Sequence, residues 1–278
     1  MNKIMFFFVV IFSYQLKIFS QNKGSIIYKQ INPSGKVTFF KLYFEKEKSI
    51  YFGNRSGSIS KFEKINAPVS IEDTISDNQN ELNNAMMSRK KIYSYFTDEE
   101  GDCIYKNFKD STLIFRQVLS HSPLIIQEPK LPHLFWNFTL EKRKIGNFNC
   151  QKATTTFRGR KYEAWYASEI SVSNGPWKLQ GLPGLILEAQ TEDRQYVYIF
   201  EKIEIPDKSL GMIKEPIKGE KCTLQNYQNT RNKNFQEGLS KLITTVEQRG
   251  ASVSFSQDPK KIQLNNLQEL NYDDLKNQ

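Results

Sequence analysis

Residues 149–167 read NCQKATTTFRGRKYEAWYA, and this stretch indicates the class of fold. Two runs that are rich in aromatic and β-branched side chains lie on either side of Arg158-Gly159-Arg160. Such side chains fit the pleated surface of a sheet, and a glycine between two runs permits the tight turn of a hairpin. The stretch therefore predicts two antiparallel strands joined by a short turn.

Similar runs follow one another through most of the chain before residue 206. They are short, mostly rich in aromatic residues and separated by turn residues, at residues 25–30, 37–44, 49–53, 91–96, 103–108, 112–119, 136–141, 185–190 and 196–205. Strands that are close in sequence usually pair with their neighbours. We expect a mainly β fold, an antiparallel meander of roughly ten strands, for which a curved half-barrel is one form.

The remaining composition divides the chain. We expect a β domain over residues 21–205, interrupted by a polar excursion over residues 54–88 that is rich in Ser and Asn. Residues 206–278 form a C-terminal extension, in which five apolar side chains recur at intervals of three or four: Phe235, Leu239, Leu242, Ile243 and Val246. This spacing predicts an amphipathic helix over residues 234–248 that docks on the sheet, followed by a loose tail.

The first residues predict the destination of the protein. Lys3 precedes an unbroken apolar run over residues 4–12, and Ser20 is followed by polar residues. This pattern is typical of a secretory signal peptide, here residues 1–20. No later run reaches the roughly 18 to 20 apolar residues of a membrane-spanning helix. We expect an exported protein, periplasmic or extracellular, that does not span a membrane.

Charge gives little indication of a partner. The formal net charge is +9, from 39 lysines and arginines against 30 aspartates and glutamates. Such a balance can attract an anionic partner. The basic residues are scattered, however, and the longest basic run is Arg89-Lys90-Lys91. We therefore expect no nucleic-acid partner.

Residues that could carry chemistry are few. His121 and His133 are the only histidines, and the sequence has no zinc, phosphate-binding or dinucleotide-binding motif. We expect no catalytic residue, no metal and no cofactor. The alternative is a secreted hydrolase whose site the fold assembles from distant carboxylates or from Cys150 as a nucleophile. With Cys103 and Cys222, the cysteines number three, so at most one internal disulfide can form, and the pairing stays open.

Residues 168–184, which we call the lobe, form a long connection between two predicted strands. The lobe combines glycine and proline with large apolar side chains, among them Trp177, Leu179 and Leu182. Long ordered loops commonly carry function or cover part of a core. The lobe therefore either plugs one end of the core of the sheet or lines an apolar cavity. Its last residues, with Pro183 before Gly184, suit a type II turn with positive φ at the glycine.

The string GLPGLI at residues 181–186 resembles the motif of the GLPGLI family of exported proteins, found among one group of Gram-negative bacteria. Three upstream blocks, GPW, FRGRKYEAWYASEI and IGNFNCQKA, share the resemblance. It is specific over residues 136–188, weaker in the N-terminal strands and absent from the tail. The positions that match the motif are Gly175, Pro176, Gly181, Leu182, Pro183, Gly184, Leu185 and Ile186, with Cys150 and Trp165 upstream.

The resemblance implies a β-rich domain that is secreted through the inner membrane, and members often accompany outer-membrane uptake receptors. No activity is established for the family, and none of the matched residues is a known catalytic residue. We expect a non-catalytic envelope protein that binds an apolar or amphipathic ligand or an outer-membrane partner protein. The expected binding residues are Trp177, Leu179, Leu182, Pro183, Gly184, Leu185 and Ile186.

Overall fold

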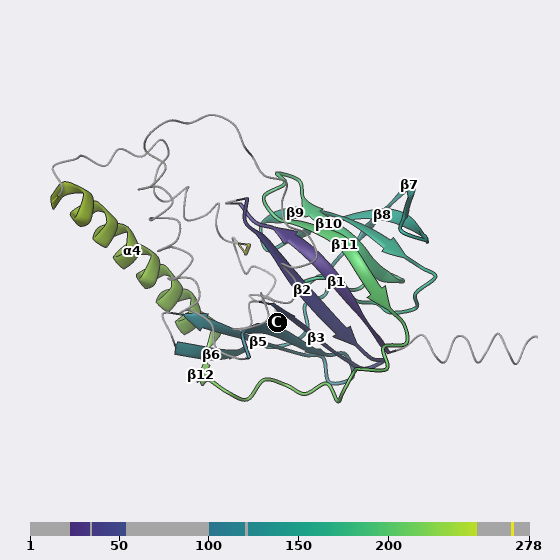
Figure 1. Ribbon diagram of the computed structural model, residues 1–278, viewed down its shortest axis with the longest axis horizontal. Helices are drawn as coiled ribbons and strands as arrows, with labels where there is room; N and C mark the ends of the chain where they lie inside the picture. The colour runs from purple at the N-terminus through teal and green to yellow at the C-terminus, as the bar shows by residue number, and fades with distance from the viewer. Residues whose placement is uncertain (1–22, 34, 54–99, 120–121, 249–267, 270–278) are drawn as a thin grey trace, which may run out of the picture.

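The computed structural model describes residues 23–33, 35–53, 100–119, 122–248 and 268–269 (Figure 1). In these residues the protein has an open, mostly antiparallel sheet of 12 strands and a C-terminal helix, α4 (Leu224–Gln248). The strands are β1 (Gly24–Ile31), β2 (Val37–Phe44), β3 (Lys48–Gly53), β4 (Asp102–Asn107), β5 (Thr112–Leu119), β6 (Ser122–Gln127), β7 (Asn137–Ile145), β8 (Phe148–Phe157), β9 (Arg160–Ala167), β10 (Leu185–Thr191), β11 (Val197–Glu204) and β12 (Glu220–Cys222). The mainly β, antiparallel fold with a C-terminal helix that the sequence predicted is confirmed.

The sheet consists of two meanders that meet at β1. Strands β1 to β6 pair in chain order, and strands β7 to β11 do the same. The two meanders join because β1 pairs antiparallel with β11, with Ser25 opposite Glu204. β12 then adds to the outside of β6 as a parallel neighbour. The first and last strands of the predicted β domain therefore lie side by side at the centre of the sheet.

The connection between β6 and β7 requires the sheet to curve. β6 is second and β7 twelfth in the order of the sheet, so ten spacings of about 4.8 Å would place them about 48 Å apart in a flat sheet. The chain from Gln127 to Asn137 spans at most roughly 36 Å when fully extended. The two halves must therefore bend toward each other. We call the face that carries the main hydrophobic cluster, with Tyr28, Leu42 and Phe115, the inner face.

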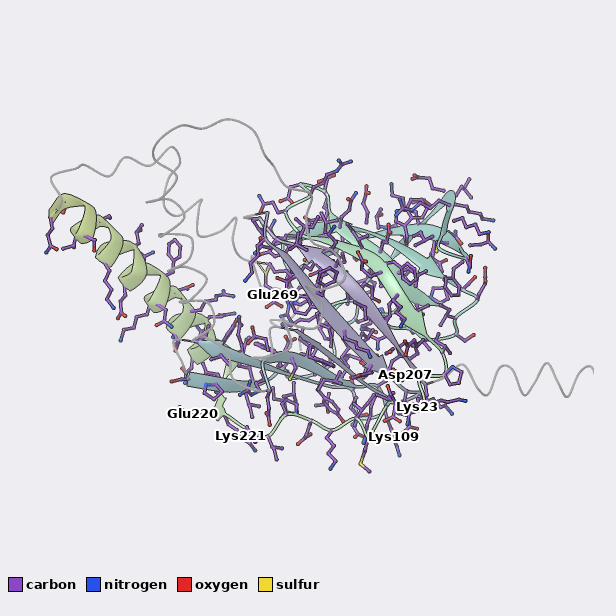
Figure 2. The ribbon with its side chains drawn as sticks, in the orientation of Figure 1. Lys23, Lys109, Asp207, Glu220, Lys221 and Glu269 are labelled. Atoms are coloured by element: carbon purple, nitrogen blue, oxygen red, sulfur yellow. The ribbon has the colours of Figure 1, made fainter. Side chains whose placement is uncertain are left out.

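The segment between β11 and β12 covers part of the outer face. Ile213 of this segment is buried in a small cluster with Tyr105 and Ile125. Asp207, labelled in Figure 2, holds the start of the segment by accepting a 2.6 Å hydrogen bond from Ser25 Oγ. The segment thus reaches β6 and brings β12 beside it.

Two strands escaped the sequence prediction. β6 contains Pro123, which normally argues against the interior of a strand, and β12 is only three residues long. β6 forms because both of its faces are covered. Leu124 and Ile126 face the main cluster, while Ile125 faces the outer one.

α4 begins earlier than predicted and contacts the core through its first turns. It starts at Leu224 rather than at residue 234, and Thr223 Oγ1 caps it by accepting a 3.2 Å hydrogen bond from the backbone N–H of Asn226. Leu224 and Tyr227 in the first turns pack against the main cluster. The rest of the helix extends away from the sheet (Figure 1). The contact with the main cluster is thus made by the N-terminal turns, and docking of residues 234–248 stays a prediction, because two of the five side chains on that face lie outside what the structure describes.

Several predicted features lie outside the described residues: the signal peptide, the polar excursion, the strand at residues 91–96 and most of the tail. The exceptions in the tail are Gln268 and Glu269. Glu269 is buried, and Figure 2 shows it closer to the strands than to the far end of α4. The tail is therefore not loose at this point. Among the described helical residues, none form a helix long and apolar enough to cross a membrane.

Candidate functional site

The lobe is part of the core of the protein. Leu179 and Leu182 are fully buried, as are Leu185 and Ile186 at the start of β10. All four belong to the main hydrophobic cluster on the inner face. Pro183, by contrast, is exposed. Of the two interpretations of the lobe, a plug for the core of the sheet therefore describes most of it.

Lys106 of β4 holds the lobe from inside. Its ammonium donates hydrogen bonds to Asn174 Oδ1 and to the carbonyl oxygen of Leu179, each at 3.0 Å. The side chain is fully buried. This burial, together with the positive charge of Lys178, lowers the pKa of Lys106 to about 7. Lys106 thus supplies hydrogen-bond donors to the lobe. Its burial, however, makes the charged form of the ammonium less favourable than it is in water.

Other hydrogen bonds fix the C-terminal part of the lobe and the start of β10. The hydroxyl of Tyr28 donates to the carbonyl oxygen of Ile186 at 2.6 Å. Trp136 Nε1 donates to the carbonyl oxygen of Gln180 at 2.8 Å, and Gln180 Nε2 donates to that of Pro132 at 2.5 Å. Because paired buried polar groups specify one arrangement, the lobe is a rigid part of the fold.

The end of the lobe is not the predicted type II turn. The N–H of Gly184 donates to the carbonyl oxygen of Leu182 at 2.8 Å, which closes a three-residue turn centred on Pro183. The φ angle of Gly184 is positive, as predicted, but at 159° it is far from the roughly +80° of a type II turn. Glycine is needed here for a different reason, since a Cβ atom would lie 2.3 Å from the carbonyl oxygen of Ala167.

Trp177 sits in an aromatic group at the tip of the lobe. Its indole stacks on Tyr162 with ring centroids 6.0 Å apart, and Phe157 meets it at 5.6 Å with the rings steeply tilted. Its φ angle is 54°, in the left-handed region that residues other than glycine rarely adopt. A residue keeps such a strained backbone conformation only where contacts with its neighbours hold it in place. Here the aromatic contacts and the neighbouring Lys178 supply that support.

Four charged side chains form a buried cluster beside Trp177: Glu128, Arg158, Lys178 and Glu269. Arg158 donates to the two carboxylate oxygens of Glu128 at 3.1 and 2.6 Å, and Lys178 Nζ lies 2.5 Å from Glu128 Oε1. Both cations also contact Glu269 Oε1, Arg158 at 2.5 Å and Lys178 at 2.7 Å. The four side chains are at most 8% exposed. Each of the two cations thus contacts both carboxylates, and such pairing offsets part of the cost of burying ions.

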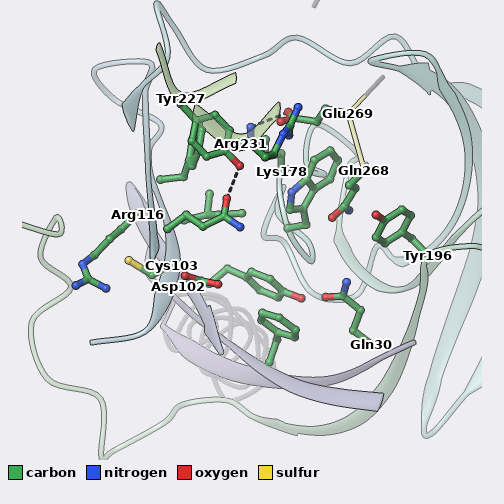
Figure 3. A pocket seen from close by; sticks show the side chains of 16 residues that line it. Gln30, Asp102, Cys103, Arg116, Lys178, Tyr196, Tyr227, Arg231, Gln268 and Glu269 are labelled. Carbon is green, nitrogen blue, oxygen red and sulfur yellow. Dashed lines mark hydrogen bonds and ion pairs between the residues drawn. The ribbon is translucent and has the colours of Figure 1, made fainter. Parts of the chain in front are cut away.

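A cavity of about 260 Å³ opens next to this cluster (Figure 3). Its lining contains six aromatic side chains: Phe40, Tyr51, Phe115, Trp177, Tyr196 and Tyr227. Lys178, Glu269 and Gln30 are among the polar side chains that complete it. Figure 3 shows Gln30 and Tyr196 directed toward the interior and the guanidinium of Arg116 turned away from it. The 16 lining residues therefore comprise six aromatic and eight polar or charged ones.

Tyr51, one of the residues that line this cavity, carries an unusual group. Its hydroxyl is buried and has no hydrogen-bond partner among the described residues. The ring stacks on Phe40 with centroids 4.9 Å apart and planes 2° apart, and the residue is 3% exposed. Burial raises the pKa of Tyr51 well above its ordinary value, so the hydroxyl stays protonated. An unpaired buried hydroxyl costs roughly 1–3 kcal/mol, and such a group calls for an explanation.

The structure does not gather the predicted binding residues at one site. Trp177 lines the cavity, whereas the others fill the core, lie exposed or pack against β9: Leu179, Leu182, Pro183, Gly184, Leu185 and Ile186. Sequence reasoning missed Tyr51 and the charged cluster. One signal was available, because Lys178 interrupts an apolar run and a lysine there needs a buried partner.

Cys150, the alternative nucleophile, lies in the core. It is 2% exposed, and its thiol donates to the carbonyl oxygen of Phe148 at 3.7 Å. Burial raises the pKa of the Cys150 thiol to about 11, against the opposing effect of Arg143. A nucleophilic cysteine needs the opposite shift. All three cysteines are free thiols, and the described residues contain no group of three or more side chains suited to hold a metal.

Comparisons with known proteins match the same part of the chain. A family model described as a protein of unknown function (Porph_ging) matches residues 156–188, which run from the end of β8 through β9 and the lobe into β10. No curated protein matches the sequence. The family match thus coincides with the segment that carries the GLPGLI string.

Solved structures show a distant likeness. The structure of PNGF-II in space group P21 is 15% identical with a TM-score of 0.49, and the match covers 77% of this chain and 34% of that one. The same protein in space group C2 is 16% identical with a TM-score of 0.46, over 76% and 33% of the two chains. An uncharacterized conserved protein from Thermus thermophilus is 7% identical with a TM-score of 0.37, over 76% and 99%. The chain thus spans about a third of the length of PNGF-II, and scores this low carry no information about activity.

Proposed function

We propose that this chain is an exported, non-catalytic binding protein that holds a small amphipathic ligand in the cavity that Tyr51 and Trp177 line. The unpartnered hydroxyl of Tyr51 is the observation that carries the proposal. A ligand that forms a hydrogen bond with this hydroxyl removes the cost of burying it unpaired. A lining that combines aromatic side chains with polar groups suits an amphipathic ligand, and a volume of about 260 Å³ suits one smaller than most drugs.

The wider setting of this function rests on the sequence. We place the chain in the GLPGLI family because of residues 181–186 and the blocks before them. Export to the periplasm or beyond rests on the signal pattern of residues 1–20. In this proposal the lobe has a supporting role. It closes the core and presents Trp177 to the cavity, while β3 supplies Tyr51.

The test compares the wild type with Tyr51→Phe, each purified from cells that make the protein naturally. Small molecules released on denaturation are identified by mass spectrometry, and Tm is measured on the same samples. We expect Tyr51→Phe to retain less of the released compound, with a Tm equal to or above that of the wild type. Tyr105→Phe, on the outer face, is the matched control and should retain as much compound as the wild type.

The proposal fails if the wild type releases no specific compound. It also fails if Tyr51→Phe retains as much compound as the wild type. A clear fall in Tm for Tyr51→Phe would show that the hydroxyl already has a structural partner, and this too would reject the proposal.

A further inference from the structure

The two carboxylates of the buried cluster come from very different parts of the chain. Glu128 directly follows β6 and is part of the sheet's own framework. Glu269 comes from the C-terminal tail, 111 residues from Arg158 and 91 from Lys178. Without Glu269, the two cations of the cluster would lose one of the two carboxylates that both of them contact. Arg158 and Lys178 are therefore placed to receive a carboxylate that the sheet itself does not provide.

The surroundings of this place favour an anion. Lys106 lies near Lys178, whose charge helps to lower the pKa of Lys106. The ammonium of Lys178 also lies 4.3 Å from the ring centroid of Phe115 and 5.7 Å from that of Trp177. An anion held by Lys178 would thus have aromatic side chains beside it. Phe115 and Trp177 also line the cavity. A carboxylate held by Lys178 would therefore lie next to an apolar part of the cavity.

The tail enters this corner of the cavity through two described residues. Gln268 Nε2 donates to the hydroxyl of Tyr198, and the hydroxyl of Tyr162 lies 3.5 Å from the carbonyl oxygen of Gln268. Figure 3 shows Glu269 next to Lys178 at the edge of the cavity, with Gln268 between the cluster and Tyr196. The tail thus places a carboxylate and an amide where a ligand in the cavity would place its own polar groups.

We propose that Arg158 and Lys178 form a carboxylate-binding site, occupied in the resting protein by Glu269, and that the ligand of the cavity is a carboxylic acid with an apolar body that takes this site in exchange. The inference rests on the proposed function of the cavity and names the chemical class of its ligand. Exchange of one carboxylate for another leaves the buried net charge unchanged, so it avoids the cost of an unpaired ion. The apolar body then lies against Phe115 and Trp177.

The first experiment tests the carboxylate site by chemical rescue in the full chain. Glu269→Ala should lower Tm by roughly 5 to 10 °C, because it removes a carboxylate that two buried cations contact. Sodium acetate should restore part of the loss in a saturable way that an equal concentration of sodium chloride does not reproduce. Glu192→Ala, which removes a carboxylate paired with Lys161 at the surface, is the control and should show no specific response to acetate.

The second experiment tests exchange in the cavity with Glu269→Gln, which keeps the shape of the side chain but removes its charge; Tm is measured first to show that the variant is folded at the temperature used. Binding of 3-phenylpropionate and of the uncharged 3-phenylpropionamide is measured by calorimetry. The variant should bind the acid roughly tenfold more tightly than the wild type, because the tail competes less well. The amide should bind more weakly than the acid and equally to both proteins.

The outcomes separate the two proposals. If acid and amide bind alike to both proteins, the cavity binds ligands but the carboxylate site is rejected. If neither compound binds while acetate rescues Glu269→Ala, the carboxylate site stands and exchange for an acid of this kind in the cavity is rejected. If acetate acts no differently from chloride and the acid binds no better to Glu269→Gln, the cluster is only a structural ion network and the inference is overturned.

Discussion

Lys106 Nζ donates a 3.0 Å hydrogen bond to Asn174 Oδ1, although 68 residues separate the two in the sequence. The bond joins β4, in the first meander, to the lobe that follows β9, in the second. Because Lys106 is fully buried, its protonation state affects the stability of the fold. This relationship gives a prediction that stability measurements at different pH values can check.

The pKa of Lys106 is lowered from 10.5 to about 7 by burial and by Lys178. Between these two values the unfolded chain binds a proton that the folded protein lacks, so stability rises with pH by up to roughly 1.4 kcal/mol per unit. Lys106→Met removes this contribution. We expect urea unfolding between pH 7 and 9 to show the wild type gaining stability relative to Lys106→Met. The exposed Lys161→Met should follow the wild type, and parallel profiles for Lys106→Met would contradict the prediction.

Gly184 should not tolerate a side chain. A Cβ atom there would lie 2.3 Å from the carbonyl oxygen of Ala167, and backbone cannot move aside cheaply. We expect Gly184→Ala to lower the free energy of unfolding by more than roughly 2 kcal/mol. Gly211→Ala is the control, because a Cβ atom at Gly211 meets nothing within 4 Å. Equal stability of the two variants would reject the close contact.

Trp177 should be a core residue with a strained backbone. Because it is 8% exposed and packs on Tyr162, Trp177→Ala should cost roughly 3–5 kcal/mol, measured by urea unfolding. Trp165→Ala should cost less, since Trp165 is only partly buried. Trp177→Gly should be at least as stable as Trp177→Ala, because glycine adopts a φ of 54° without strain. A less stable glycine variant would argue against the left-handed conformation.

The three thiols should differ in reactivity. Burial raises the pKa of Cys150 to about 11, and Cys103 is also buried. Cys222 is partly exposed. Incubation with iodoacetamide at pH 8, followed by mass spectrometry, should therefore label Cys222 first and Cys150 only after unfolding. Rapid labelling of Cys150 in the folded protein would revive the hydrolase alternative.

The sequence by itself predicted most of the strands. β2 and β5 have the predicted bounds, because a strand alternates its side chains between two faces and this pattern is local. β6 and β12 escaped, since their pairing depends on surfaces that distant segments bring to both sides of β6. The lobe was also recognisable as an apolar, folded connection, and Trp177 in it does line the cavity.

The candidate site was decided by the tertiary structure. No distinctive sequence pattern surrounds Tyr51, Arg158 or Glu269. Their neighbours in the sequence do not indicate which face of the sheet each side chain lies on or which partner it contacts. They come together because β1 joins the two meanders, the sheet curves, and the tail returns to the inner face. Hydrophobic alternation is a property of neighbouring residues, whereas pairing of buried polar groups depends on which distant segments the fold places in contact.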